Sequence, residues 1–298
     1  MTTLKAMAAD LDQDPRAQRR RELPDRDPMA RRLRMQDSRG RLSDTVADIE
    51  SDVVAALGLG QFSLLYQPRM ALDSGDVVAV EALLRWQDSA RGLLGPKAFL
   101  PLVAQTSAMV ALGQWVLYEA SREAARWELE RPAGVRPVMV SVNVAALEVL
   151  EPAFFDSVQL ILEEHALPTT QLQLEIDASD PLRGETVVTT RLGLLRDEGI
   201  RVAIDGACPQ LGSGSLHMDA DSIHLHRRWT RSIANDAALA EAVAGLVERT
   251  HRSGGTVCAM GVETQAQADV LSVVGCDLGQ GYFYCDPVPS DLIGWLDS

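Results

Sequence analysis

The sequence predicts an α/β protein folded as a (β/α)8 barrel. Short apolar segments alternate with helical patterns from residue 61 onward, and eight such segments within about 235 residues match the size and order of one barrel. The predicted strands are Ser63–Gln67, Val77–Arg85, Val138–Val144, Leu172–Asp177, Val202–Asp205, Ser222–Leu225, Thr256–Met260 and Gly279–Tyr284. A doubly wound open sheet is the alternative, but no glycine-rich phosphate loop follows the first strand.

Helical patterns separate most of these strands. Apolar residues recur at helical spacing in three stretches, two of which end before a glycine, Gly199 or Gly254. The apolar faces are Leu112, Val116, Ala120, Ala124 and Trp127 in the first stretch, Val188, Leu192 and Leu195 in the second, and Leu239, Val243, Leu246 and Thr250 in the third. We expect helices with their apolar faces on the barrel.

Three regions are expected along the chain: a tail in residues 1–42, a helix in residues 43–60 and the barrel in residues 61–298. The tail is rich in arginine and buries almost nothing, so we expect it to be disordered, or else to dock as an arm on an anionic surface. Ser43 can cap the helix, which ends at about Leu57 before Gly58 and Gly60. Its apolar residues Val46, Ile49, Val53, Val54 and Leu57 would pack on the barrel or on a second subunit.

Composition limits the possible functions. The tail carries 11 basic and 7 acidic side chains, and the remaining residues carry 17 and 35. Such an acidic body argues against a nucleic acid polymer as partner. No apolar run approaches the roughly 18 residues of a membrane span, and the start lacks a signal peptide, so we expect a cytoplasmic protein. The cysteines Cys208, Cys258, Cys276 and Cys285 form no C-x-x-C pair, so we expect reduced thiols, and their spacing does not support a zinc site.

Glu81 stands inside the apolar run from Val77 to Leu84. Burying an unpaired polar group costs on the order of 2 to 7 kcal/mol, and a charge costs more. Glu81 therefore needs a partner or a cation, unless it lies on a solvent-facing side of the strand.

A barrel places functional groups at the carboxyl ends of its strands. These ends carry Glu81, Asn143, Glu175, Asp205, His224 with His226, Met260 and Gln280. Four oxygen-bearing side chains from four strands indicate a site for Mg²⁺, Mn²⁺ or Ca²⁺, because hard cations prefer carboxylate and amide oxygens. Taken singly, each could instead be a strand-end residue hydrogen-bonded to a loop.

From about Phe62 to Leu296 the chain resembles the EAL domain family of cyclic di-GMP phosphodiesterases. The matching stretches are Tyr66-Gln67-Pro68, Glu81-Ala82-Leu83-Leu84-Arg85-Trp86, Phe99-Leu100-Pro101-Leu102, Leu112-Gly113-Gln114-Trp115-Val116-Leu117, Ser141-Val142-Asn143, Leu174-Glu175-Ile176, Gly261-Val262-Glu263-Thr264 and Gln280-Gly281-Tyr282. The resemblance implies a barrel whose first strand is antiparallel to its neighbours. It also implies chemistry in which two metals activate a water that opens one phosphodiester of the cyclic dinucleotide.

By this resemblance, Glu81, Asn143, Glu175 and Asp205 would hold the first metal, either Mg²⁺ or Mn²⁺. The other catalytic positions depart from the family. Gly206 replaces the second of two adjacent Asp residues, His224 and His226 replace a Lys and an Asp, and Met260 replaces a Glu. The loop after Asp205 and the pair Asp177-Ala178 differ as well. We therefore expect no second metal and a catalytically inactive member.

Positions that line the dinucleotide pocket in the family correspond here to Gln67, Glu81, Leu83, Arg85, Asp205, Gln280 and Pro287. The resemblance thus favours a cyclic di-GMP receptor acting on an unidentified protein partner, with a homodimer as one possible assembly. A nucleotide-independent protein-interaction module and an active phosphodiesterase are the alternatives. Arg85 could instead pair with Glu81 or a loop carbonyl, and Gln67 could merely cap a strand. His224, His226 and Cys208 could turn the site toward zinc, although local hydrogen bonding explains them more simply.

Overall fold

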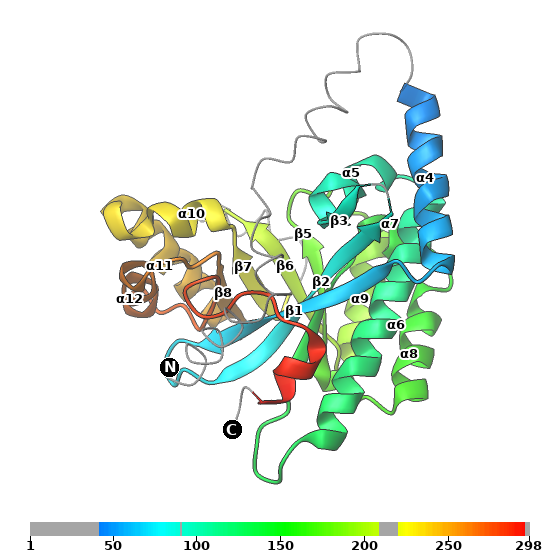
Figure 1. The fold of residues 1–298 in the computed structure, drawn as a ribbon. Helices are drawn as coiled ribbons and strands as arrows, with labels where there is room; N and C mark the ends of the chain where they lie inside the picture. Colours follow the sequence, from blue (N-terminus) through cyan, green and yellow to red (C-terminus); the bar gives the residue numbers. More distant parts are fainter. Residues whose placement is uncertain (1–41, 90, 209–219, 296–298) are drawn as a thin grey trace.

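Eight strands close a barrel in the computed structural model, which describes residues 42–89, 91–208 and 220–295 (Figure 1). The barrel strands are β1 (Phe62–Ala71), β2 (Val77–Asp88), β4 (Met139–Asn143), β5 (Leu172–Asp177), β6 (Arg201–Ala207), β7 (Ser222–Leu225), β8 (Thr256–Met260) and β9 (Leu278–Gln280). β1 is antiparallel to β2 and β9, and the other neighbours around the barrel are parallel. The predicted barrel and its reversed first strand are confirmed.

Two predicted strands need correction, and one strand was missed. The first strand does not end at Gln67 but continues to Ala71. The last strand does not reach Tyr284 but ends at Gln280. It ends there because the chain turns at Gly281 against the backbone of Val262, where a Cβ would lie 2.1 Å from the Val262 oxygen. The strand that was not predicted is β3 (Gly92–Leu94), which pairs antiparallel with β2 outside the barrel.

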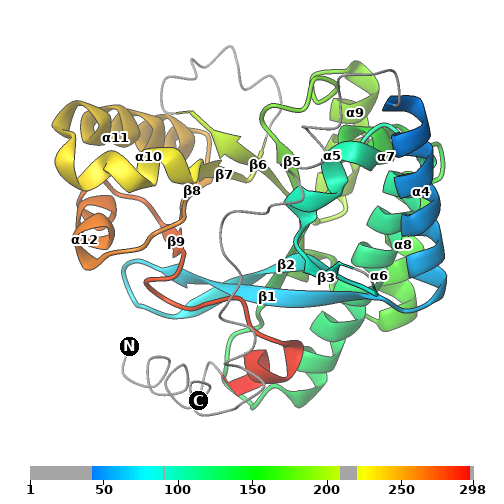
Figure 2. The same ribbon diagram turned by 45° about the horizontal axis from the view of Figure 1, so that its top comes forward.

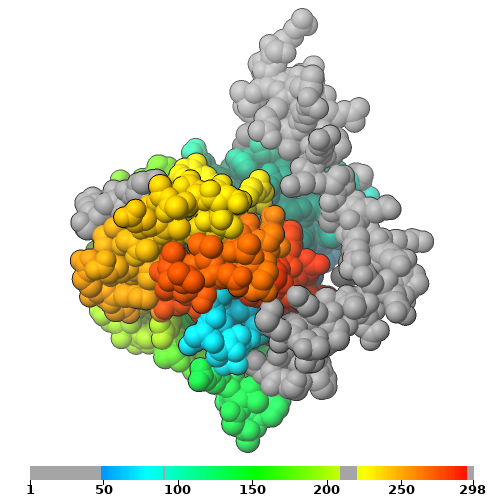
Figure 3. Space-filling model, turned by 90° about the vertical axis from the view of Figure 1, so that its left-hand side faces the viewer, coloured from blue at the N-terminus to red at the C-terminus, as the bar shows by residue number. Residues whose placement is uncertain are grey.

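Helices cover the outside of the barrel (Figure 2). They are α5 (Leu100–Val103), α6 (Ser107–Glu130), α7 (Ala146–Leu150), α8 (Phe154–His165), α9 (Thr186–Asp197), α10 (Arg227–Ser232), α11 (Ala237–Arg252) and α12 (Gln265–Val273). The apolar faces expected in α6, α9 and α11 are buried, as predicted. Figure 3 shows α10, α11 and α12 forming one outer face of the molecule, beside the β1–β2 hairpin in cyan.

The helix that precedes the barrel, α4 (Leu42–Gly58), packs on α5 and α6 of the same chain. Ile49, Val53 and Ala56 form its buried face. Val54 was expected in this face but is 52% exposed, because it lies on the opposite side of the helix from Ile49 and Ala56. The structure does not describe residues 1–41 or the side chains of Ser43 and Val46. The cap at Ser43, the packing of Val46 and the disorder of the tail therefore stay predictions.

The outer face of β1 and β2 carries an aromatic cluster. Trp86 is 1% exposed and packs edge-on against Phe99, with ring centroids 5.2 Å apart. Phe62 contacts both of these rings. The cluster fixes β1 and β2 against the helices, so that their other face lines the inside of the barrel. Within the described residues, no helix combines the length and apolar character required to span a membrane.

Candidate functional site

The register between β1 and β2 decides which side chains enter the barrel. Gln67 lies opposite Glu81, and side chains two residues apart on a strand share a face. Gln67, Arg69 and Glu81 are all buried on the inner face. Tyr66, on the outer face, packs edge-on against Trp127 of α6 with ring centroids 4.9 Å apart.

Glu81 is held by two amides. Asn143 donates from Nδ2 to Glu81 Oε1 at 2.8 Å, and Gln280 donates from Nε2 to Glu81 Oε2 at 2.7 Å. The Arg69 guanidinium lies 3.6 Å from the same Oε2 atom. Glu81 therefore has the partners that its burial in an apolar strand demands, and it does not face solvent.

Glu175 is less exposed than Glu81 and is fully buried. Arg69 Nη1 lies 2.6 Å from its Oε1 atom, and His224 Nδ1 lies 3.3 Å from its Oε2 atom. Burial alone would raise the pKa of Glu175, but the charge of Arg69, followed by that of His224, outweighs burial and holds this pKa below its usual range. Glu175 is thus a buried carboxylate between two cationic or potentially cationic groups.

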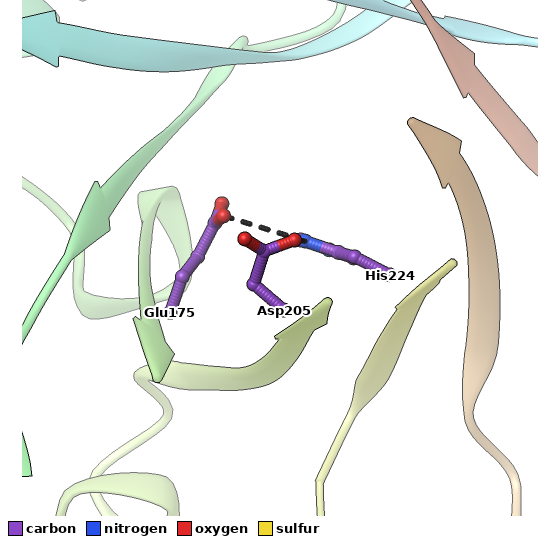
Figure 4. Close-up of side chains that lie close together, drawn as sticks. All are labelled: Glu175, Asp205 and His224. Atoms are coloured by element: carbon purple, nitrogen blue, oxygen red, sulfur yellow. Dashed lines mark ion pairs between the residues drawn. The ribbon is translucent and has the colours of Figure 1, made fainter. Parts of the chain in front are cut away.

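Asp205 completes a three-residue group with Glu175 and His224 at the mouth of the barrel (Figure 4). One ligand atom from each side chain lies within 4.8 Å of the others. Burial, and then the nearby charge of Glu175, raise the pKa of Asp205 to about 6. Three strands, β5, β6 and β7, bring the group together at their carboxyl ends.

Comparison with known proteins places this architecture in a family. The model of the EAL domain matches residues 50–287. The chain belongs to the EAL domain family. Among curated EAL relatives, the bifunctional diguanylate cyclase/cyclic di-GMP phosphodiesterase MucR of Pseudomonas aeruginosa is 32% identical over 248 residues, covering 81% of this chain and 35% of MucR. An uncharacterized Mycobacterium bovis protein, Mb1392c, is 31% identical over 252 residues, covering 82% of this chain and 81% of that protein.

Solved structures of EAL domains share the fold. The structure of the PaMucR phosphodiesterase in complex with c-di-GMP matches with a TM-score of 0.75 at 31% identity, covering 83% of this chain and 99% of that one. The EAL enzyme Bd1971 matches with a TM-score of 0.80 at 23% identity, covering 90% and 72% of the two chains. The chain spans only about a third of the length of MucR and of two other curated relatives. It spans most of the shorter Mb1392c.

Two of the four predicted metal ligands of this EAL domain belong to the group that contains His224. Glu175 and Asp205 lie together with His224, whereas Glu81 and Asn143 are hydrogen-bonded to each other. Glu175 Oε2 and His224 Nδ1 are buried, lie 3.3 Å apart, and form no other hydrogen bond among the described residues. Two carboxylates and an imidazole fit one divalent ion, and the imidazole favours Mn²⁺ or Zn²⁺ over Mg²⁺.

Binding of an ion at His224 Nδ1 requires the proton to lie on the other ring nitrogen. That nitrogen, Nε2, lies 3.2 Å from the Gln173 amide nitrogen, which can only donate, so this contact places the ring proton on Nδ1, facing Glu175. An ion at Nδ1 therefore requires the Gln173 amide to turn over, so that its oxygen accepts from Nε2. Gln173 is buried and therefore fixes the orientation of the ring. The predicted set of Glu81, Asn143, Glu175 and Asp205 stays a prediction.

The predicted pocket residues occupy several levels of the barrel. Gln67 donates to the Cys285 carbonyl at 3.0 Å and accepts from Gln280 at 2.9 Å, so it joins a buried network and does more than cap a strand. Leu83 and Arg85 are half-buried on the inner face of β2, and Pro287 is half-buried near β1. Arg85 Nη1 donates to its neighbouring carbonyl of Leu84 at 2.7 Å. Burial lowers the pKa of Arg85, against the opposing effects of Tyr282 and Glu81.

The residues that differ from the family at the catalytic positions do not share one environment. Gly206 has a φ of +77°, which L side chains rarely adopt. His226 is exposed, accepts from the Arg228 backbone N–H through Nδ1 at 3.1 Å, and caps α10. Met260 Sδ lies 3.7 Å from the Cys258 thiol. The ligand group at Glu175 includes neither His226 nor Cys208, so a zinc site built from both histidines and Cys208 is not what the structure assembles.

Arg69 belongs to the site but was not predicted, because the sequence was searched only at the carboxyl ends of the strands. Besides its two carboxylate contacts, it donates to Gln280 Oε1 at 2.7 Å and to the Ser141 hydroxyl at 2.8 Å. A signal was present, because Arg69 is a basic residue flanked by Pro68 and Met70 within an apolar strand.

Proposed function

We propose that this EAL domain is a receptor for cyclic di-GMP that does not hydrolyse it and that acts on an unidentified protein partner. The MucR relative carries cyclic di-GMP phosphodiesterase in its name, and the PaMucR structure is a c-di-GMP complex. Inward-facing Gln67, Glu81 and Gln280, with Arg85 nearer the mouth, support a retained ligand pocket.

The observation that carries the loss of catalysis is the chemistry at positions 224 and 260. His224 is fully buried and faces Glu175 and Asp205, where the family has an aliphatic ammonium. The Met260 thioether neither accepts a proton nor binds a hard cation. A general base contributes about 10² to 10⁴ in rate, and electrostatic stabilisation contributes a further 10² to 10³, without strict additivity. Losing these groups together removes useful turnover.

Any bound ion would be held by Glu175, Asp205 and His224, and a second ion lacks a carboxylate because residue 206 is glycine. Such an ion would supply positive charge for a ligand phosphate at the mouth. The chain's own contribution is Arg85, whose planar guanidinium can pair with a phosphate through two hydrogen bonds.

Calorimetry with cyclic di-GMP, with Mg²⁺ or with a chelator, tests the receptor proposal. Arg85→Ala should weaken binding at least about tenfold, since a charge-assisted hydrogen-bonded pair is worth roughly 1.5 to 3 kcal/mol. Arg252→Ala is the matched control, because Arg252 ends α11 on the opposite side of the barrel and is 68% exposed. No heat at high micromolar nucleotide would leave the protein-interaction module as the function.

Product analysis tests the phosphodiesterase alternative. The histidine in the ligand group makes Mn²⁺ and Zn²⁺ the ions to supply, besides Mg²⁺. We expect cyclic di-GMP to remain intact with each ion. Appearance of the linear dinucleotide at a rate abolished by Glu81→Gln would establish catalysis and contradict the proposal.

A further inference from the structure

Arg69 occupies a central position beneath the mouth of the barrel. Its side chain is fully buried, and its guanidinium contacts residues from four other strands. These residues are Glu81 of β2, Ser141 of β4, Glu175 of β5 and Gln280 of β9. One cation therefore joins five of the eight barrel strands.

The charge balance around Arg69 explains its position. Glu81 and Glu175 are both buried, and buried carboxylates require a cation or several hydrogen bonds. Glu81 has amide partners, whereas neither oxygen of Glu175 has a hydrogen bond of good geometry. Glu175 thus depends on its ion pairs, first with Arg69 at 2.6 Å and then with His224 Nδ1 at 3.3 Å.

We propose that Arg69 is a built-in cation that keeps Glu81 and Glu175 assembled without a divalent ion. Its guanidinium fills the space between these two carboxylates. An added ion is confined to the other side of Glu175, toward Asp205 and His224. The barrel mouth therefore forms in the absence of metal, independently of whether the domain binds a nucleotide.

Thermal unfolding of the full chain, in a chelator and in Mn²⁺, tests this inference. The wild-type melting temperature should differ by less than about 2 °C between the two conditions. Arg69→Met should lower it by about 10 °C or more in chelator, because removing one partner of a buried ion pair leaves an uncompensated charge. Mn²⁺ should restore at least half of this loss, because the ion replaces the missing charge, and should bind at least about tenfold more tightly than to the wild type.

Two further variants separate charge from packing. Arg196→Met makes the same substitution at the half-buried pair with Asp221, and Mn²⁺ should not restore its stability. Arg69→Met combined with Glu175→Gln removes both charges and should be more stable in chelator than Arg69→Met alone, even where the single variant is recovered poorly. A double variant no more stable than the single one would overturn the inference. So would a wild type that loses its stability in chelator.

Discussion

Replacing Glu148 with glutamine probes a buried carboxyl that the proposed site does not use. Glu148 lies in α7, is 3% exposed, and accepts a hydrogen bond from the Ala145 backbone N–H at 2.8 Å. Its second oxygen lies against Gly113 of α6, so closely that a Cβ on that glycine would be 1.5 Å away. Burial raises the pKa of Glu148 to about 8, and the hydrogen bond from Ala145 opposes this only in part.

This shift makes stability depend on pH with a definite sign. The carboxyl has an ordinary pKa of 4.5, so between there and about 8 the unfolded chain has lost a proton that the folded chain keeps. The contribution of Glu148 to the free energy of unfolding is therefore fully present below the ordinary pKa. It is lost as pH rises toward the folded-state pKa. At pH 7.5 the loss is roughly 4 kcal/mol, from about three pH units at about 1.4 kcal/mol each.

Denaturant unfolding at several pH values between about 5 and about 8 measures the effect. Glutamine keeps an oxygen for the Ala145 N–H and cannot ionise. Glu148→Gln should therefore be within about 1 kcal/mol of wild type at the acidic end and more stable by about 2 to 4 kcal/mol at the basic end. Glu151→Gln removes one carboxylate at an exposed position nearby and controls for net charge. Wild-type and Glu148→Gln curves that stay parallel would refute the reasoning.

Two further substitutions test packing, each measured by the free energy of unfolding. Gly113→Ala should cost about 2 kcal/mol or more, because its Cβ would displace the Glu148 carboxylate, whereas Gly193→Ala in α9, with nothing within 4 Å, should be neutral or stabilise by up to about 1 kcal/mol. Equal effects would contradict the contact. Trp86→Ala should cost about 3 to 5 kcal/mol because it empties the aromatic cluster, and Leu129→Ala, at an 89% exposed position, should cost less than about 0.5 kcal/mol. A Trp86 effect as small as that of Leu129 would exclude the cluster as a source of stability.

The barrel could be predicted because its strands and helices carry clear periodicities. β5, β7 and β8 have the predicted bounds, since each is a short, largely buried segment with apolar residues at alternate positions. The apolar face of α6, from Leu112 to Trp127, follows the helical repeat over four turns. Patterns of this kind depend only on which side of an element meets the core, so sequence reasoning is sufficient for them.

Predictions failed where tertiary contacts override the local pattern. Val54 is as apolar as its buried neighbour Val53, and only the position of α4 against α5 and α6 decides which is covered. β9 ends at Gln280 because the Val262 backbone, distant in sequence, receives the next turn. α8 was missed, although Phe154, Val158, Ile161 and Leu162 have helical spacing and are buried. That omission was avoidable.

Arg69 shows how strand direction limits a search of strand ends. In parallel barrel strands the residues at the carboxyl end reach the mouth, but β1 is reversed, so its later residues lie deeper. Gln67 pairs with Glu81, and Arg69, two residues further, pairs with Ala79, one side-chain layer below. Arg69 can therefore reach Glu81 from beneath. The predicted first strand also ended at Gln67, two residues short of Arg69. A charged residue inside an apolar strand calls for an opposite charge on an adjacent inward-facing position, and applying this rule to a first strand extended to Ala71 would have paired Arg69 with Glu81 from the sequence.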